Sequence, residues 1–267
     1  MWRLLVLLVG TAAAAENVPR ADGKTMDARL YGEWAQPGCP PTLLLSHGLG
    51  GNANGLSRVA QAAAVSGWRV MVMGHAESGP RRLFAVLRAD DRTAAIRAAL
   101  PWQDRARDLE AAIARASRDC RPQPFVLGGH SMGAAMTMFE AGAAGVPPFA
   151  GRDRFDAYVA LSPQGTGWAF ASDRAWRGVR KPVLMVTGTR DNGLDGDWTT
   201  RARAFDGLRP GQKRLAVIDG ATHVGLVGSQ PRIAATVAQV VTEYLTHVMS
   251  GWRPSALAGP GVTIRDK

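Results

Sequence analysis

Short apolar segments alternate with helical patterns along most of the chain, from about residue 25 to residue 249. Most of the apolar segments are nearly continuous, which is typical of strands buried on both faces of a sheet. Strands that alternate with helices favour a largely parallel sheet. We therefore predict an α/β fold with a mostly parallel central sheet and helices on both faces. The predicted strands are 26–34, 41–46, 68–73, 125–128, 156–161, 182–187 and 214–219, and the predicted helices are 55–66, 101–117, 132–145, 198–207 and 231–249.

The N-terminus has the composition of a secretory signal peptide. Met-Trp-Arg leads into an apolar run over residues 4–10, and four alanines up to Ala15 offer small residues for cleavage before Glu16. A membrane anchor would need about 20 apolar residues, whereas Glu16 and Pro19 interrupt this run early. We predict that residues 1–15 are a signal peptide removed on export, which places the mature protein in the periplasm or outside the cell.

The rest of the chain has the size of one domain. Residues 16–249 carry the alternating pattern, and α/β folds of this length commonly form a single domain. Residues 250–267 contain Pro254 and Pro260 and show no periodicity, so we expect an irregular C-terminal tail. We expect the protein to be a monomer.

The chain is strongly basic, with a formal net charge of +10. Its 32 lysines and arginines are spread along the chain without a dense run, and no nucleic-acid motif accompanies them. We therefore expect no nucleic-acid partner. Beyond the signal peptide no stretch is apolar and long enough to span a bilayer, so no stable membrane insertion is expected.

The two cysteines of the chain suggest one disulfide, as expected for an exported protein. Cys39 and Cys120 each stand a few residues before a predicted strand. In the predicted fold these strands are parallel neighbours, so their starts lie at the same edge of the sheet. A bridge between Cys39 and Cys120 is therefore the favoured prediction, and two buried free thiols are the alternative.

The segment Gly129-His130-Ser131-Met132-Gly133 matches the nucleophile elbow, in which a serine sits on a tight turn from strand to helix. The glycines two residues before and after the serine avoid side chains that would collide in this turn. The pattern alone is weak, because the chain contains 31 glycines. A predicted strand before it and a predicted helix after it strengthen the assignment of Ser131 as a nucleophile over a glycine-rich turn with an incidental serine.

A serine hydroxyl needs a base to take its proton, and the base needs a carboxylate to hold it. Among the five histidines, only His223 follows the last predicted strand, where a loop can carry its ring over the serine. His47 and His75 follow earlier strands and suit pocket walls or supporting roles. His130 stands next to the serine and must point elsewhere, and His247 lies near the end of the last helix.

The carboxylate is expected between the serine and the histidine in sequence, just past the end of a strand. Asp191 meets both conditions, and Asp195 and Asp197 are rivals that stand further from the strand and suit loop caps. The position after the preceding strand offers Ser162 and Gln164 but no carboxylate. We predict a triad of Ser131, Asp191 and His223.

Acyl transfer places negative charge on a carbonyl oxygen, which two backbone N–H groups usually receive. Met132 follows the nucleophile and supplies one, and we predict that Leu49 in the glycine-rich loop 46–51 supplies the other. The alternative for this loop is a phosphate cradle, but the lysine and hydroxyl pattern of a nucleotide site is missing. Neither a dinucleotide motif nor a cysteine and histidine metal cluster is found, so we expect no cofactor and no metal.

Together these motifs resemble the α/β-hydrolase superfamily and, more narrowly, bacterial hydrolases similar to platelet-activating-factor acetylhydrolases and dienelactone hydrolases. The resemblance spans about residues 41–249 and implies an α/β-hydrolase fold and ester hydrolysis. Dienelactone hydrolases have a cysteine at the elbow where this chain has Ser131. The motifs are Ser46-His47-Gly48-Leu49-Gly50-Gly51, Gly129-His130-Ser131-Met132-Gly133, Ala160-Leu161-Ser162-Pro163-Gln164-Gly165, Thr187-Gly188-Thr189-Arg190-Asp191 and Asp219-Gly220-Ala221-Thr222-His223.

The predicted function is therefore hydrolysis of a small-molecule or polymeric carboxylic ester with short to medium acyl groups. Segment 163–181 is short for a cap domain, so we expect a minimal cap and an open cleft. His75, Trp168 and Trp198 are the candidate substrate-binding residues, although the tryptophans suit the core equally well. A peptidase or amidase, an acyltransferase and a non-catalytic binding protein on the same fold remain as alternatives.

Overall fold

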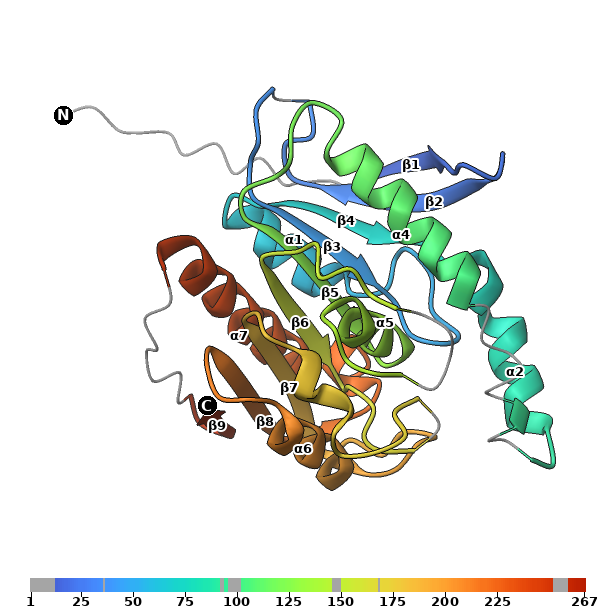
Figure 1. Cartoon of the computed structure of the whole chain (residues 1–267), viewed down its shortest axis with the longest axis vertical. Coiled ribbons are helices and arrows are strands. Elements are labelled where there is room, and N and C mark those ends of the chain that lie inside the picture. Colours follow the sequence, from blue (N-terminus) through green and yellow to red (C-terminus); the bar gives the residue numbers. More distant parts are fainter. Residues whose placement is uncertain are drawn as a thin grey trace.

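A single mixed sheet forms the centre of the molecule, with strand order β1-β2-β4-β3-β5-β6-β7-β8-β9 (Figure 1). The computed structural model describes residues 13–35, 37–91, 94–95, 102–145, 150–167, 169–251 and 259–267. The strands are β1 (Ala14–Pro19), β2 (Thr25–Tyr31), β3 (Thr42–Ser46), β4 (Arg69–Met73), β5 (Phe125–His130), β6 (Ala157–Leu161), β7 (Val183–Arg190), β8 (Lys213–Thr222) and β9 (Val262–Asp266).

The six central strands from β4 to β8 are parallel, and antiparallel strands flank them at both edges. Ser46 at the end of β3 pairs with Gly129 of β5, and Leu161 at the end of β6 pairs with His130. The loops that follow these strands therefore emerge close together at one edge of the sheet, where open α/β sheets form their sites.

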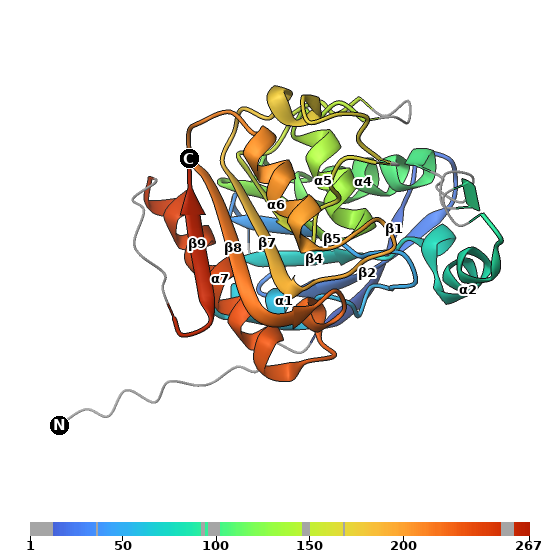
Figure 2. The ribbon, with the colours of Figure 1, turned by 90° about the horizontal axis from the view of Figure 1, so that it is seen from below.

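Helices cover both faces of the sheet (Figure 2). Side chains of β3 alternate between the two cores. Leu44 belongs to the core that contains α4 (Trp102–Ala116), α5 (Met132–Glu140) and α6 (Trp198–Gly207), whereas Leu43 and Leu45 belong to the core that contains α1 (Ser57–Val65) and α7 (Pro231–Ser250). The predicted fold class is confirmed. The helices are α1 (Ser57–Val65), α2 (Pro80–Arg88), α4 (Trp102–Ala116), α5 (Met132–Glu140), α6 (Trp198–Gly207) and α7 (Pro231–Ser250), with 3-10 turns η1 (Ala76–Ser78), η2 (Ala175–Gly178) and η3 (Gly225–Val227).

Each predicted strand and helix overlaps an observed one, but among the described residues two strands and one α-helix were not predicted. They are β1, β9 and α2, the last of which lies in the long connection between β4 and α4. Between β6 and β7, η2 is the one helical turn within the described residues 163–167 and 169–181. This short connection agrees with the expectation of a minimal cap.

The prediction of an irregular tail over residues 250–267 is wrong at its end. Residues Val262–Asp266 form β9, which pairs antiparallel with β8, and Asp266 accepts a hydrogen bond from Arg214 Nε at 2.8 Å. The strand is short and half exposed, so it carries no apolar run that sequence patterns would detect. The open edge of β8 provides the partner that makes it a strand.

The predicted signal peptide lies mostly outside the described residues. Its last two residues, Ala14 and Ala15, pair with Leu30 and Arg29 at the start of β1. No helix in the described part of the chain is both long and apolar enough to cross a membrane.

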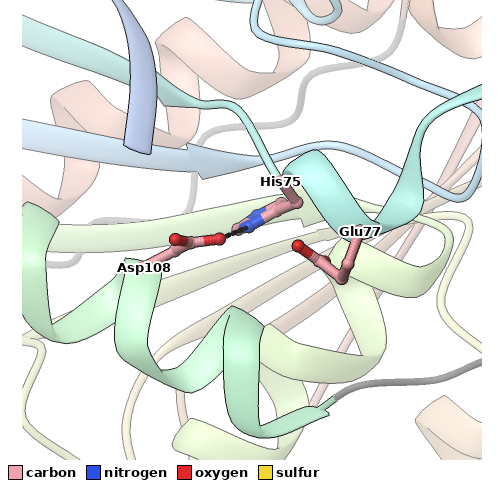
Figure 3. Close-up of side chains that lie close together, drawn as sticks. All are labelled: His75, Glu77 and Asp108. Atoms are coloured by element: carbon pink, nitrogen blue, oxygen red, sulfur yellow. Dashed lines mark hydrogen bonds and ion pairs between the residues drawn. The ribbon is translucent and has the colours of Figure 1, made fainter. Parts of the chain in front are cut away.

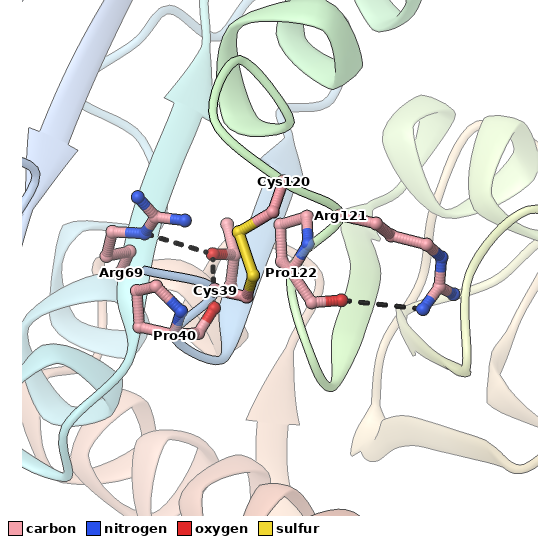
Figure 4. Close-up of a disulfide and its surroundings, with 7 residues drawn as sticks. Cys39, Pro40, Arg69, Cys120, Arg121 and Pro122 are labelled. Atoms are coloured by element: carbon pink, nitrogen blue, oxygen red, sulfur yellow. Dashed lines mark hydrogen bonds between the residues drawn. A yellow bond between two sulfur atoms is a disulfide. The ribbon is translucent and has the colours of Figure 1, made fainter. Parts of the chain in front are cut away.

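The predicted disulfide is confirmed: Cys39 and Cys120 are bridged, with their Cα atoms 5.6 Å apart (Figure 4). The bridge ties the loop before β3 to the loop before β5. Gln123 N–H also donates to Cys39 O at 3.3 Å, and Thr42 N–H donates to Pro124 O at 3.0 Å. The starts of these two strands are thereby fixed at the edge opposite the site.

Candidate active site

Ser131 lies on a sharp turn between β5 and α5, with φ 53° and ψ −119°. A residue other than glycine rarely adopts this conformation, and the surrounding structure must hold it there. A Cβ on Gly129 would lie 2.4 Å from the carbonyl of Gly133, and a Cβ on Gly133 would lie 2.0 Å from Ser46 O. Both positions therefore require glycine, and the predicted elbow is confirmed as a structural feature.

His223 follows β8, and its side chain reaches over the turn to Ser131. Its Nε2 lies 3.0 Å from Ser131 Oγ, and its Nδ1 lies 2.8 Å from Asp191 Oδ1. Because an ionised carboxylate only accepts hydrogen bonds, the ring proton is assigned to Nδ1, and Nε2 remains free to accept the proton of the serine hydroxyl. The structure thus brings the three predicted residues into one hydrogen-bonded chain.

Asp191 is fully buried just past the end of β7. Ser162 Oγ donates to its Oδ1 at 3.0 Å, Thr187 Oγ1 donates to its Oδ2 at 2.8 Å, and Arg201 Nε lies 3.2 Å from Oδ2. Burial by itself raises the pKa of Asp191, but the hydrogen bond from His223 and the charge of Arg201 outweigh it and lower the pKa. The residue therefore stays ionised and can hold a protonated imidazole.

The two rival carboxylates have other partners. Asp195 Oδ1 accepts from Arg201 Nη2 at 2.9 Å, and burial raises the pKa of Asp195. Asp197 caps α6 by accepting from Thr199 N–H at 2.9 Å, as expected for a loop cap. Of the three aspartates, Asp191 is the one hydrogen-bonded to His223.

The two predicted N–H donors, Leu49 and Met132, belong to residues that line the same cleft as Ser131. Neither N–H donates to a group within the described part of the chain. Gly48 brings the loop close to the serine, because a Cβ at this position would lie 3.0 Å from Ser131 Cβ. The geometry therefore leaves both N–H groups available beside Ser131.

A buried polar network lies behind the loop that carries Leu49. Arg105 Nη1 on α4 donates to His47 O at 2.8 Å and to Ser46 Oγ at 3.0 Å. His75 hydrogen-bonds Ser46 Oγ through Nε2 at 2.9 Å and Asp108 Oδ2 through Nδ1 at 2.8 Å. Like the hydrogen-bonded chain at Ser131, this network joins a serine, a histidine and an aspartate. Ser46, however, is fully buried and cannot meet a substrate. Its contacts instead fix the start of the loop 46–51.

His75, Glu77 and Asp108 point toward one another in this network (Figure 3), and one ligand atom from each lies within 4.8 Å of the others. The carboxylates already have cationic neighbours. Arg20 Nη1 lies 2.9 Å from Asp108, and Arg105 Nε lies 3.4 Å from Glu77. Because these two guanidiniums supply the positive charge, the cluster fits an ion-pair network better than a metal site.

Two further histidines support the site in their neutral form. Burial and the charge of Arg105 lower the pKa of His47 to about 3. Burial and the nearby His223 lower the pKa of His130 to about 3, and His130 Nε2 hydrogen-bonds His223 O at 2.9 Å. His130 therefore points away from the serine, as predicted, and holds the loop that carries the candidate base.

A cleft of about 540 Å³ opens at Ser131 and His223, which is the size of a small-molecule site. Gln164 and Asp195 contribute polar groups to its wall. Gln164 is 2% exposed, and its Oε1 has no hydrogen-bond partner among the described residues. The apolar part of the lining comes from Leu49, Leu83, Met132, Leu194 and Val224.

Two of the three predicted substrate-binding residues, His75 and Trp198, do not line this cleft. His75 is buried, and both of its ring nitrogens are occupied by Ser46 and Asp108, so its assignment as a substrate contact is wrong. Trp198, the first residue of α6, does not line the cleft and packs against the core, so this assignment is wrong as well. Trp168 lies outside the described residues.

The structure places four residues at the site to which the sequence analysis assigned no role there. Arg201 and Ser162 contact Asp191, and Gln164 and Leu83 line the cleft. One signal was available for Arg201, because it stands three residues before the buried Ala204 on the inner face of α6. An arginine on the apolar face of a helix indicates a buried partner of opposite charge.

Several solved structures resemble this one over nearly their whole length. Est1E from Butyrivibrio proteoclasticus has a TM-score of 0.62 at 16% sequence identity, covering 88% of this chain and 99% of its own. Esterase 2 from Thermogutta terrifontis, phosphorylated by paraoxon, has a TM-score of 0.58 at 15% identity, covering 96% and 100%. The chain has the α/β-hydrolase fold.

A dienelactone hydrolase from Anabaena variabilis shares this α/β-hydrolase fold, with a TM-score of 0.57 at 19% identity, covering 89% of this chain and 98% of its own. No protein-family model matches the sequence, and no curated protein is significantly similar to it. The likeness to these solved structures is therefore a likeness of fold, and the chemistry must be derived from the residues of this chain's own site.

Proposed function

We propose that this chain is a serine hydrolase that cleaves carboxylic esters through an acyl-enzyme on Ser131. The observation that carries the proposal is the hydrogen-bonded chain from Ser131 through His223 to Asp191, located on a strained turn at the floor of an open cleft. A nucleophile, a base and a buried carboxylate in this order are the parts that acyl transfer requires.

In the first half of the reaction, Ser131 Oγ attacks the ester carbonyl while His223 Nε2 takes the hydroxyl proton. The N–H groups of Leu49 and Met132 receive the negative charge that develops on the carbonyl oxygen. Asp191 holds the imidazolium that forms. His223 then gives the proton to the departing alcohol, which leaves the acyl group on Ser131.

In the second half, a water molecule gives a proton to His223 and attacks the acyl carbon. The same N–H groups stabilise the second tetrahedral intermediate, and its collapse returns the proton to Ser131 and releases the acid. Arg201 and Ser162 act through Asp191, because their hydrogen bonds fix the carboxylate that orients His223.

Esters are favoured over amides and over acyl transfer to other acceptors because the similar structures include proteins named as esterases. The apolar lining suits short to medium acyl groups, and the buried amide of Gln164 replaces His75 and Trp198 as the candidate polar contact to substrate. No cofactor takes part in this scheme.

We also propose that the protein is exported after cleavage before Glu16. The Cys39–Cys120 bridge supports this, since disulfides persist mainly in oxidising compartments. Residues Glu16 to Pro19 of β1 would remain paired with β2 after cleavage. N-terminal sequencing of protein recovered from the periplasm or the medium tests the proposal, and an intact Met1 would contradict it.

The enzymatic proposal is tested with a fluorophosphonate probe and p-nitrophenyl esters of increasing acyl length. The wild type should be labelled and should hydrolyse the esters, whereas Ser131→Ala should lose labelling and at least about 1,000-fold in kcat. Ser250→Ala, an exposed serine at the end of α7, serves as the matched control. An unlabelled wild type, or full turnover by Ser131→Ala, would refute the proposal.

A further inference from the structure

Exposed large apolar side chains are concentrated around the cleft. Six are exposed among the described residues: Val65 at 79%, Phe84 at 59%, Leu87 at 40%, Leu194 at 49%, Val224 at 55% and Met249 at 52%. Leu194 and Val224 line the cleft, and Phe84 and Leu87 belong to α2, whose Leu83 lines it too. Two of these six side chains therefore line the cleft, and two more lie on the helix that contributes Leu83 to it. Such a patch usually marks an interaction site.

Helix α2 is amphipathic, but only part of its apolar face is covered. At 100° per residue, Leu83, Phe84, Val86 and Leu87 occupy one arc and Arg81, Arg82 and Arg88 occupy the other. Val86 is buried, whereas Phe84 and Leu87 face solvent. Both views show α2 projecting at the periphery of the molecule (Figures 1 and 2).

Leu83 joins this helix to the reactive centre. It packs against Gly50, where a Cβ would lie 2.5 Å from Leu83 Cδ2, and Gly50 follows Leu49 in the loop beside Ser131. Gly50 N–H also donates to Ser78 O at 2.7 Å, just before α2 begins. The exposed arc of α2 is thus held at the mouth of the cleft.

The charge of α2 is entirely positive. Its three arginines are exposed and form no ion pair with the described residues, while the nearest acidic residues, Glu77 and Asp90, lie outside the helix. The whole chain carries a formal net charge of +10. An exposed apolar arc flanked by arginines is the pattern of a helix that lies in the surface of an anionic membrane.

We propose that α2, together with Leu194 and Val224, docks the mouth of the cleft onto an anionic lipid surface. Phe84, Leu87, Leu194 and Val224 enter the boundary between headgroups and acyl chains, and the arginines of α2 contact the anionic headgroups. If the proposed ester hydrolysis holds, the substrate is an ester carried in that lipid layer. The docking itself does not depend on catalysis.

Flotation with lipid vesicles tests the docking, using the Ser131→Ala protein so that no lipid is consumed. The probes are phosphatidylcholine vesicles with and without phosphatidylglycerol. Binding is expected to the anionic vesicles and to fall as salt is added, because salt screens the attraction. Equal binding to both kinds of vesicle, or no binding to either, would overturn the proposal.

Two double variants locate the contact. Phe84→Ser with Leu87→Ser should reduce partitioning at least about tenfold, since both side chains lose apolar burial in lipid. Val65→Ser with Met249→Ser removes apolar side chains that are also exposed but lie outside α2 and the cleft, and this variant should leave binding unchanged. Arg81→Gln and Arg82→Gln should each weaken binding roughly fivefold. Equal losses in the two double variants would show that the contact is not at α2.

Activity separates this proposal from the proposed function. In a background with Ser131 intact, Phe84→Ser with Leu87→Ser should hydrolyse a soluble p-nitrophenyl ester like the wild type, because neither side chain lines the cleft. Its turnover of the same acyl group presented in anionic vesicles should fall about tenfold with the loss of binding. If the wild type does not hydrolyse the soluble ester, the proposed hydrolase function is refuted. If the double variant hydrolyses the vesicle-bound ester as fast as the wild type, the proposed docking is refuted.

Discussion

The elbow glycines allow a graded test of how closely the site depends on the packing of β3 against α5. In Gly133→Ala the new Cβ would stand 2.0 Å from Ser46 O, 2.6 Å from Ser46 C and 3.0 Å from His47 O. These are backbone atoms at the start of the loop that carries Leu49, so no flexible side chain can relieve the contact. Either β3 or α5 must shift by about 1 Å, a displacement that can cost about 100-fold in rate.

Two further variants complete the series. Gly48→Ala places its Cβ 3.0 Å from Ser131 Cβ, so a shift of a few tenths of an ångström suffices, and we expect a loss of roughly tenfold. Gly79→Ala is the matched control, since its Cβ would lie 3.9 Å from Ala76 O, an ordinary contact distance, and its φ of −68° suits alanine.

The assay is kcat/KM for a p-nitrophenyl ester, with thermal unfolding measured in parallel. The loss of kcat/KM should be largest in Gly133→Ala and smaller in Gly48→Ala, and Gly79→Ala should show no loss. Overpacking should also destabilise Gly133→Ala by about 1–3 kcal/mol. Wild-type kcat/KM in a folded Gly133→Ala protein would refute the reasoning, and if that variant does not fold, an unaffected Gly48→Ala would do so.

Two predictions concern stability. Replacing Cys39 and Cys120 by serine should lower the free energy of unfolding by about 4 kcal/mol, because the bridge spans 81 residues. In urea denaturation the reduced wild type should be as stable as this variant. A variant as stable as the oxidised wild type would contradict the prediction. The unfolded chain takes up protons on His47 and His130 below pH 6.5, whereas the folded protein does so only near pH 3, so stability falls as pH falls through this window. The loss should be about 2 kcal/mol per histidine at pH 5, and His130→Gln should flatten the pH dependence of the free energy of unfolding.

Local patterns in the sequence were sufficient to predict most of the fold and the three residues that form the hydrogen-bonded chain at the cleft. Continuous apolar runs identified the strands of the parallel core. A strand that is buried on both faces needs apolar side chains at successive positions, so its own sequence shows that it is buried. The tight turn at Ser131 demands glycines at fixed spacing, and His223 and Asp191 follow strands whose ends meet at one edge. These requirements act over a few residues, so they are visible in the sequence.

Tertiary structure alone decided which polar residues face the cleft and which are buried. His75 and His223 both follow strands, yet α4 covers His75 with Asp108 and Arg105, while His223 reaches the cleft. Arg201 reaches Asp191 only because α6 packs beside β7, and β9 is a strand only because β8 has an open edge. Such contacts join residues far apart in the chain, and their energy depends on burial and distance, which no local pattern contains.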